Sequence, residues 1–289
     1  MNNPDIQLNI RHIRAGNPSP FTGTGTNTYL VGRGNVAVID PGPALPDHRD
    51  AIIGALDDGE KITHIFVTHS HLDHSELAPE LSAMTDAPIL AYGDSAAGRS
   101  DHMSAFGDLG GGEGVHADFK PDILIKDDET VAGADWELSA HWTPGHFGNH
   151  LCFSYEDILF SGDLVMGWST SLVSPPDGDL TAFMNSLDKL RARPHRRYLP
   201  GHGEAVDAPA DRVDELLYHR RMRETQILEQ LETAAADAAQ LTKLIYTEVP
   251  AHLHPAAERN VLAHLIDLVQ KNRVIPDGTL NTSATFRLK

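Results

Sequence analysis

The chain has 289 residues, of which 40% are hydrophobic, and it carries a formal net charge of −18 at pH 7. This length and composition exclude a disordered chain and allow a large core together with a second, smaller domain. The acidic balance repels polyanions and argues mildly against a nucleic-acid substrate, although salt screens charges beyond about 8–10 Å. No apolar run approaches the ~18 residues of a membrane span. With no signal segment at the N-terminus and a single cysteine, Cys152, we expect a soluble, cytoplasmic protein without a membrane partner.

The first part of the chain is predicted to form strands around one short helix. Residues 6–14 alternate apolar and polar side chains, which is typical of a half-buried strand. Residues 29–31 and 36–39 are expected to form a hairpin around Gly32-Arg33-Gly34-Asn35. Asp40 follows directly; we interpret it as a turn residue, with the alternative that its carboxylate orients a metal-bound histidine. A helix at 47–56 and a buried strand at 62–67 complete this part.

The strand at 62–67 runs into Thr68-His69-Ser70-His71-Leu72-Asp73-His74, which places four metal-binding side chains within six positions. On a loop that leaves a strand these side chains can converge on one point, whereas a helix would turn some of them away. The alternative is a polar turn with no ligand. We favour the metal site, because this spacing rarely arises by chance.

The middle of the chain continues with alternating elements and one long loop. Residues 98–121 contain Gly110-Gly111-Gly112 and little apolar content, so we expect a loop that covers the site. Hairpin connections are too frequent for a purely parallel sheet, which favours two mixed sheets with helices outside. Helices are predicted at 76–84 and 180–190, and strands at 89–91, 123–125, 136–138, 150–153, 158–160 and 198–199.

The chain beyond Pro209 is mainly helical. Helices are predicted at 211–232, 242–246 and 255–270, followed by a hairpin around Asp277-Gly278. This order suggests a small winged-helix-like module. We therefore divide the chain into a catalytic domain at 1–208 and a C-terminal helical, winged-helix-like domain at 209–289.

Three more candidate ligands, His146, Asp163 and His202, follow predicted strands, each directly after a glycine. Glycine lets backbone and ion approach closely, although each such pair alone is more often a turn. Together with the four residues at 69–74 they supply five histidines and two aspartates. This set suffices for two ions that share a carboxylate. Among the other histidines, His64 is interpreted as a core residue like Cys152, and the roles of His150, His252 and His254 stay open.

This order of ligands resembles that of the metallo-β-lactamase fold superfamily. The resemblance implies an α/β (α+β) fold, a four-layer αβ/βα sandwich with the site at one edge of its two sheets. His74 sets the chain apart from the antibiotic-cleaving members, which use other ligands at the second site. The metal ligands that the resemblance implies are His69, His71 and His146 on the first ion, Asp73, His74 and His202 on the second, and Asp163 between them.

Within the superfamily, the chain is most similar to the β-lactamase-like endoribonuclease family of animal mitochondria and its bacterial relatives. The similarity covers nearly the full length. Ser75 stands where many relatives carry glycine, and Phe147 where threonine is common. The segments that carry the similarity are 26–30, 162–163, 184–187, 200–203, 219–223, 226–228, 244–246 and 264–265.

The ligand types suit two Zn²⁺ ions per chain, and they also fit Mn²⁺ or Fe. A metal-bridging hydroxide would be the nucleophile, because a bound water's pKa can fall to about 7. Asp73 is predicted to be the catalytic proton shuttle as well as a ligand, by analogy with the superfamily. The function predicted is hydrolysis of a small ester, thioester or lactone.

Two alternatives remain at this stage. The first is a metal-dependent endoribonuclease that cuts single-stranded RNA. Residues 189–223 hold nine basic residues against five acids, yet lack interleaved aromatics and equally fit a solvated helix face with ion pairs. The second is a mono-iron, persulfide-type oxygenase. Oligomerisation is left open. The arginines that would line an RNA path are Arg191, Arg193, Arg196, Arg197, Arg220, Arg221 and Arg223.

Overall fold

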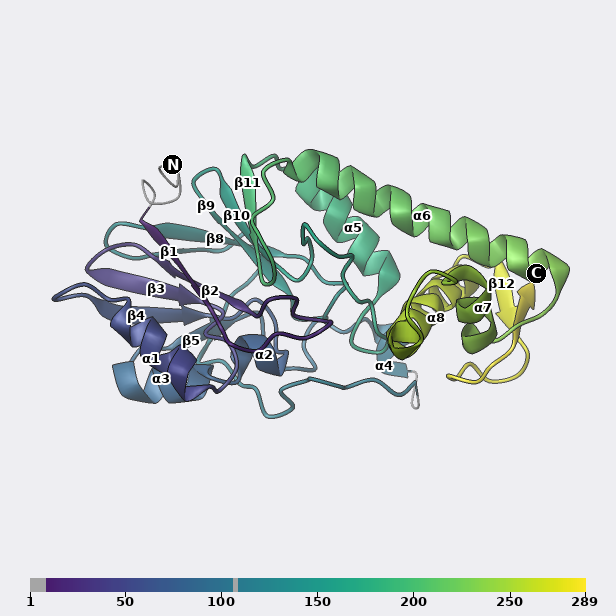
Figure 1. The fold of residues 1–289 in the computed structure, drawn as a ribbon, viewed down its shortest axis with the longest axis horizontal. Coiled ribbons are helices and arrows are strands. Elements are labelled where there is room, and N and C mark those ends of the chain that lie inside the picture. Colours follow the sequence, from purple (N-terminus) through teal and green to yellow (C-terminus); the bar gives the residue numbers. More distant parts are fainter. Residues whose placement is uncertain (1–8, 106–108) are drawn as a thin grey trace.

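The computed structural model describes residues 9–105 and 109–289, and it contains two facing β-sheets (Figure 1). The strands of the first sheet are β1 (Ile10–Arg14), β2 (Asn27–Val31), β3 (Asn35–Ile39), β4 (Lys61–Phe66), β5 (Ile89–Ala91) and β6 (Ile123–Leu124). They lie in the order β1-β2-β3-β4-β5-β6, antiparallel as far as β3 and parallel beyond it. The predicted hairpin at 29–39 is confirmed. Of the predicted strand at 6–14, residues 6–8 lie outside the described part of the chain.

The second sheet has the order β11-β10-β9-β8-β7 and is also mixed. Its strands are β7 (Thr130–Ala132), β8 (Glu137–Trp142), β9 (Leu151–Tyr155), β10 (Ile158–Gly162) and β11 (Arg197–Pro200). Strands β10 and β11 run parallel because helix α5 (Leu180–Arg191) forms the crossover between them, and the other pairs are antiparallel. Strand β7 was not predicted, since its three residues, two of them exposed, carry too little pattern.

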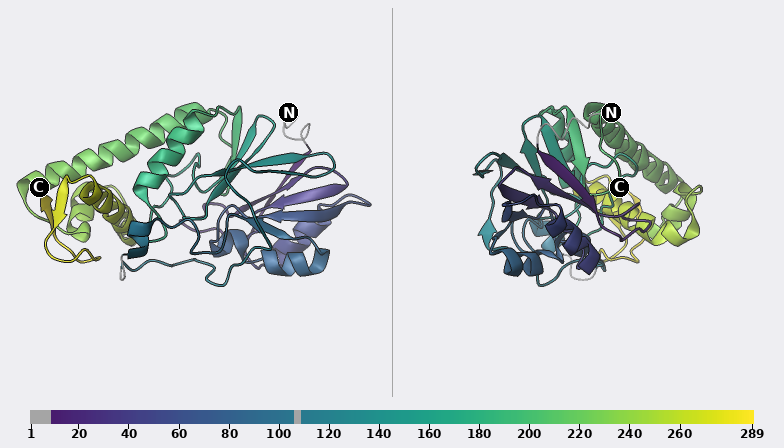
Figure 2. Two further views of the ribbon diagram at one scale, coloured as in Figure 1. Left: turned by 180° about the vertical axis from the view of Figure 1, so that it is seen from behind. Right: turned by 60° about the vertical axis from the view of Figure 1, so that its left-hand side comes forward.

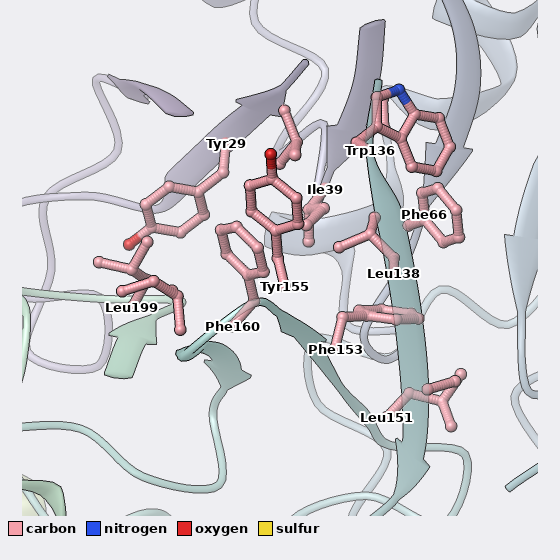
Figure 3. Packing of buried hydrophobic residues seen from close by; sticks show 14 of the residues in the cluster. Tyr29, Ile39, Phe66, Trp136, Leu138, Leu151, Phe153, Tyr155, Phe160 and Leu199 are labelled. Atoms are coloured by element: carbon pink, nitrogen blue, oxygen red, sulfur yellow. The ribbon is translucent and has the colours of Figure 1, made fainter. Parts of the chain in front are cut away.

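The central strands of both sheets, such as β2, β3, β9 and β10, are buried on both faces, which explains their near-continuous apolar character. In β3, Ala37 and Ile39 face the other sheet while Val36 and Val38 face outward. The space between the sheets is filled by large side chains such as Phe66 (Figure 3). These inward-facing residues include Tyr29, Trp136, Leu138, Phe153 and Phe160.

Helices cover the outer faces of both sheets (Figures 1 and 2). Helices α1 (Pro46–Gly54) and α3 (Ala78–Thr85) pack on the first sheet through Ile52 and Leu81. On the second sheet, α5 and the start of α6 (Pro209–Thr233) pack through Phe183 and Leu216. The layers are therefore helix, sheet, sheet and helix, and the predicted four-layer sandwich is confirmed.

The C-terminal part surrounds its own apolar core. It contains α7 (Ala238–Ile245), the 3-10 helix η2 (Ala251–Leu253), α8 (His254–Gln270) and the antiparallel hairpin β12 (Val274–Pro276) and β13 (Phe286–Leu288). Helix α6 belongs to two cores, because Leu216 packs on the sandwich while Ile227 packs on α7 and α8. The division at residues 208 and 209 stays a prediction.

Two local expectations need correction. The segment 98–121 is not entirely loop, since α4 (Asp101–Ala105) lies within it. The segment 69–74 is not entirely loop either, because α2 (Leu72–Ser75) includes Asp73 and His74. Within the described ranges, no helix combines the length and apolar character needed to cross a membrane.

Candidate metal centre

All seven predicted ligands meet at one edge of the sandwich. Four come from the segment after β4, with His69 and His71 before α2, and Asp73 and His74 within it. The helix has only four residues, so it does not carry these side chains away from the site, as a longer helix would. His146 lies between β8 and β9, Asp163 follows β10, and His202 follows β11.

The nitrogen and oxygen atoms of these side chains form three groups, and the atoms of each group lie within 4.8 Å of one another. Two groups correspond to the ligand sets that the superfamily resemblance implied, and the third links them through Asp163. The groups are His69, His71 and His146; Asp73, His74 and His202; and His69, His74 and Asp163.

Asp163 stands between the two ligand sets. One of its oxygens, Oδ2, lies 3.7 Å from His146 Nε2 and 3.3 Å from His202 Nε2. The other oxygen, Oδ1, lies 3.5 Å from His74 Nε2, is buried, and makes no hydrogen bond to any described residue. A buried carboxylate oxygen without a hydrogen bond fits a metal ligand, because an ion satisfies it. Gly201 makes room for it, since a Cβ there would lie 2.5 Å from Oδ1.

Hydrogen bonds on the outer ring nitrogens orient the histidines. His74 Nδ1 lies 2.9 Å from Asp40 Oδ2, His146 Nδ1 donates to the Leu172 carbonyl at 2.7 Å, and His202 Nδ1 lies 3.3 Å from the Gly25 carbonyl. Each contact leaves Nε2 directed into the cluster. Metal-binding histidines characteristically donate their second nitrogen to a carboxylate or carbonyl, so the donor set fits metal ions.

Asp40 is the residue whose role the sequence left open. The turn interpretation, favoured from the sequence, is incomplete. Asp40 does sit at positive φ (51°) after β3, but its side chain is buried and accepts hydrogen bonds from His74 and Thr68. Because β3 and β4 are parallel neighbours, their carboxyl ends share an edge, which brings Asp40 beside the segment that begins at Thr68.

Burial and mutual charge shift the pKa values of the cluster in two directions. Burial, reinforced by neighbouring histidines, lowers the pKa of His71 to about 3 and that of His69 well below its ordinary value. Burial acts in the same direction on His202, but the charge of Asp163 outweighs it and raises the pKa to about 9. For Asp163 itself, burial favours the neutral acid, yet His202 and His74 hold its pKa well below the usual range. For His74, burial lowers the pKa, but the charges of Asp73 and Asp163 outweigh it and raise the pKa well above its ordinary value. Metal ions bind ionised carboxylates and neutral imidazoles, so His202 and His74 must each release a proton when an ion binds.

A cleft of about 480 Å³ opens over the cluster. His71, Asp73, His146, Asp163 and His202 lie at its floor. The segment 98–121 contributes Glu113 and Gly114, so part of that segment borders the site, as expected. Most of the wall is apolar and comes from three separate segments: Phe21; Met166, Trp168 and Leu172; and Tyr246, Val249 and Leu253.

The remaining histidines lie outside the cleft lining. His150 is fully buried behind the cluster, where its Nε2 accepts a hydrogen bond from the Asp163 backbone amide at 3.2 Å. His252 is exposed, and His254 Nε2 contacts the Val249 carbonyl at 3.1 Å. His64 packs edge-on against Trp136, as expected of a core residue.

The arginines of the basic stretch are largely engaged in ion pairs. Arg196 lies 2.7 Å from Asp157, and Arg197 lies 2.7 Å from Asp207. Arg193 pairs with Asp128. Arg220 does not lie on the surface, because it is on the buried face of α6. The ion pairs agree with the alternative weighed from the sequence, but these three arginines lie in the loop after α5 and in β11 rather than on a helix face. Sequence reasoning did not single out Trp168 or Leu172, which carry no local motif.

The four-layer sandwich carries at its edge a histidine–aspartate cluster that could hold metal ions, an arrangement typical of metallo-hydrolases. Residues 21–202 match the family model of the Metallo-beta-lactamase superfamily, and residues 238–282 match that of the Beta-lactamase associated winged helix domain. The chain belongs to the metallo-β-lactamase superfamily and is a hydrolase of that superfamily, with a winged-helix domain at its C-terminal end. The predictions of family, fold and enzyme class are confirmed.

The chain is similar to relatives from animals and fungi. The Beta-lactamase-like protein 2 homolog of Drosophila melanogaster is 32% identical over 281 residues, which cover 93% of this chain and 90% of the relative. The homolog of Caenorhabditis elegans is 30% identical, with coverage of 87% and 81%. An Atrochrysone carboxyl ACP thioesterase of Cryptosporiopsis sp. (strain 8999) is 31% identical over 78% of this chain, but the match covers only 64% of that protein.

Two solved structures share the fold over nearly the whole chain. A metallo-beta-lactamase family protein from Thermus thermophilus superposes with a TM-score of 0.78 at 22% identity, covering 97% of this chain and 99% of the other. A beta-lactamase domain protein from Burkholderia ambifaria gives a TM-score of 0.78 at 20% identity, with coverage of 97% and 91%.

Proposed function

We propose that the cluster binds two metal ions. His69, His71 and His146 would hold the first, Asp73, His74 and His202 the second, and Asp163 both. The support is the convergence of these atoms and the outward hydrogen bonds of His74, His146 and His202. Zn²⁺ suits this set of nitrogen and carboxylate ligands, which also fits Mn²⁺ or Fe. Two bound ions would supply Lewis acidity and an acidified water at neutral pH.

We propose that the substrate is a small acyl ester or thioester with an apolar acyl group. The observation that carries this proposal is the cleft, in which a floor of ligand residues meets walls such as Phe21, Trp168 and Leu172. A neighbouring cavity of about 300 Å³ shares His71 and His146 with the cleft, so the scissile bond has room on both sides. Relatives named as acyl-carrier-protein thioesterases favour a thioester over a lactone.

The chain's own residues would bind and orient this substrate. The apolar walls take the acyl group out of water, a driving force of about 25 cal/mol per Å² of buried apolar surface. Asp73 lines the cleft, and its Oδ2 lies 3.2 Å from His202 Nε2 and 3.3 Å from Thr26 Oγ1. As a proposed ligand that also lines the cleft, Asp73 would take a proton from the attacking water and pass it to the leaving group.

RNA is the alternative substrate, and its support is weaker. A path for single-stranded RNA needs cations free to contact phosphate, whereas Arg193, Arg196 and Arg197 are paired with aspartates. The cleft itself has mostly apolar walls.

The test is a substrate panel on the full-length protein with its metal content measured. An acyl thioester, a lactone and a short single-stranded RNA are assayed at two salt concentrations. We expect two metal ions per chain and fastest turnover of the thioester, with little effect of salt. RNA cleavage with a steep salt dependence, or one iron per chain with oxygen consumption, would overturn the proposal.

A further inference from the structure

Arg220 of α6 is a cation buried at 1% exposure. Its Nη1 donates to Asn260 Oδ1 at 2.9 Å, its Nη2 donates to the Ser171 carbonyl, and its guanidinium lies 5.1 Å from the centre of the Phe183 ring. Within the described part of the chain its Nε makes no hydrogen bond, and the titratable groups that act on it are Tyr246 and Arg223 rather than a carboxylate. Burying a charge is unfavourable unless its surroundings compensate, so we ask what the contacts of Arg220 contribute to the protein.

Those contacts converge on three consecutive residues of the loop between β10 and α5. Arg220 holds the Ser171 carbonyl, and Asn260 Oδ1 accepts a hydrogen bond from the Val173 amide at 3.0 Å. Between them, the Leu172 carbonyl accepts the hydrogen bond from His146 Nδ1 at 2.7 Å. The loop is thus held by α6 and α8, with Asn260 also lining the cleft, while its Leu172 carbonyl holds a proposed ligand.

The same loop also contacts the segment that carries Asp163. The Ser171 hydroxyl donates to the backbone carbonyls of Asp163 and Leu164. Ser171 therefore links the residue held by Arg220 to the backbone of the carboxylate that stands between the two ligand sets. Arg220 is therefore connected through one loop to both His146 and Asp163, although it contacts neither of them directly.

We propose that Arg220 is a positioning residue for the metal centre. Through Arg220 and Asn260, the helices α6 and α8 support that centre. The Leu172 carbonyl selects the His146 tautomer with hydrogen on Nδ1, which keeps Nε2 free for a ligand bond. A planar guanidinium binds two acceptors in fixed directions, which a lysine ammonium does not reproduce. This inference rests on the proposed metal-binding function.

The experiment compares full-length Arg220→Met and Arg220→Lys with Arg221→Met, a neighbouring arginine on the exposed side of α6. Metal affinity is measured by competition with a chelator, and ligand geometry by the absorption spectrum of the Co²⁺-loaded protein. We expect both Arg220 variants to bind metal about 10–100-fold more weakly with an altered spectrum, as is typical when support of a ligand is lost. The Arg221→Met variant should match the wild-type protein.

A second pair of variants tests the same inference if Arg220→Met does not fold. Asn260→Asp keeps an oxygen for both Arg220 and the Val173 amide, whereas Asn260→Leu removes it. We expect metal affinity to fall in the leucine variant and to be largely kept in the aspartate variant. Wild-type affinity and spectrum in Asn260→Leu would overturn the inference.

One readout requires neither metal nor substrate. In the metal-free wild-type protein, the proton on His146 Nδ1 should give a hydrogen-bonded imidazole signal by NMR, assigned by its absence in His146→Gln. We expect this signal to be lost in Asn260→Leu, and its persistence would reject the positioning role. Failure of the substrate panel with a normal NMR response would instead reject only the proposed function.

Discussion

Asp40 and His74 form a buried pair in which Asp40 Oδ2 lies 2.9 Å from His74 Nδ1. The same carboxylate accepts from the Thr68 hydroxyl at 2.7 Å, and Thr68 Oγ1 lies 3.0 Å from His69 Nδ1. Because the Thr68 hydroxyl donates to Asp40, His69 Nδ1 must be the donor to Thr68. One carboxylate therefore orients a histidine of each proposed metal site.

The first prediction concerns this carboxylate. Asp40→Asn keeps an oxygen for the Thr68 amide but loses the charged acceptor that orients His74, so we expect metal affinity to fall about 10–100-fold. Titration of the metal-free protein in competition with a chelator measures the effect. The exposed Asp58→Asn is the matched control. Equal affinity in both variants would show that Asp40 serves only the turn after β3.

The second prediction concerns Asp163. Asp163→Ala removes the carboxylate that lies between the two ligand sets, and two cations held there would then repel each other without its negative charge between them. We expect at most one tightly bound metal ion per chain and a loss of activity of at least about 100-fold, as for other groups that stabilise developing charge. Elemental analysis and turnover are measured on the same preparation. An active variant with two ions would reject the dinuclear arrangement.

The third prediction concerns Trp168, a residue that lines the cleft and is 45% exposed. The indole lies against Gly23 and Gly203, where a Cβ would come within 3.2 Å and 2.3 Å of the ring, so its position is fixed. We expect Trp168→Ala to raise KM for a long-chain or aryl thioester about 10-fold, and to affect an acetyl thioester much less, because apolar contact is lost. Tyr218→Ala, an exposed aromatic on α6 outside the cleft lining, is the control. Equal changes for both substrates would argue against acyl recognition by this wall.

The fourth prediction concerns pH and His48 of α1. Burial lowers the pKa of His48 to about 4 from an ordinary value of 6.5. The Thr28 hydroxyl donates to the Asp40 carbonyl at 2.6 Å, so His48 Nε2 must donate to Thr28, at 2.8 Å. The Nδ1 atom is left buried without a hydrogen-bond partner among the described residues, and protonating it is costly.

Between pH 6.5 and about 4, His48 binds a proton in the unfolded chain but not in the folded protein. The free energy of unfolding therefore falls as the pH drops through this window, and this contribution levels off below it. We expect His48→Gln, which keeps a donor for Thr28, to show a shallower loss of stability than the wild-type protein. Urea unfolding at pH values from about 4.5 to about 7.5 makes the comparison. Parallel curves would contradict the prediction.

The sequence by itself indicated two mixed sheets and the set of residues that converge, and its resemblance to a known superfamily implied the four-layer sandwich. The signals for the strands and the ligands are local: apolar runs mark buried strands, and His69, His71, Asp73 and His74 lie together because they follow one strand. The glycines beside His146, Asp163 and His202 carried a similar signal. Short elements such as β7 and α4 were not predicted, because three to five residues show no reliable hydrophobic period.

Only the tertiary structure decided which groups orient the histidines of the cluster and which side chains line the cleft. Asp40 reaches His74 only because β3 and β4 are parallel neighbours, and a residue 34 positions away shows no such pairing in sequence. The carbonyl group of Leu172 that orients His146 belongs to the backbone, so the type of residue at position 172 does not reveal this contact. Arg220 lies in a basic run, yet its side chain is buried, whereas Arg193 and Arg196 earlier in the same run pair with aspartates. Long-range packing, rather than local pattern, determines these contacts.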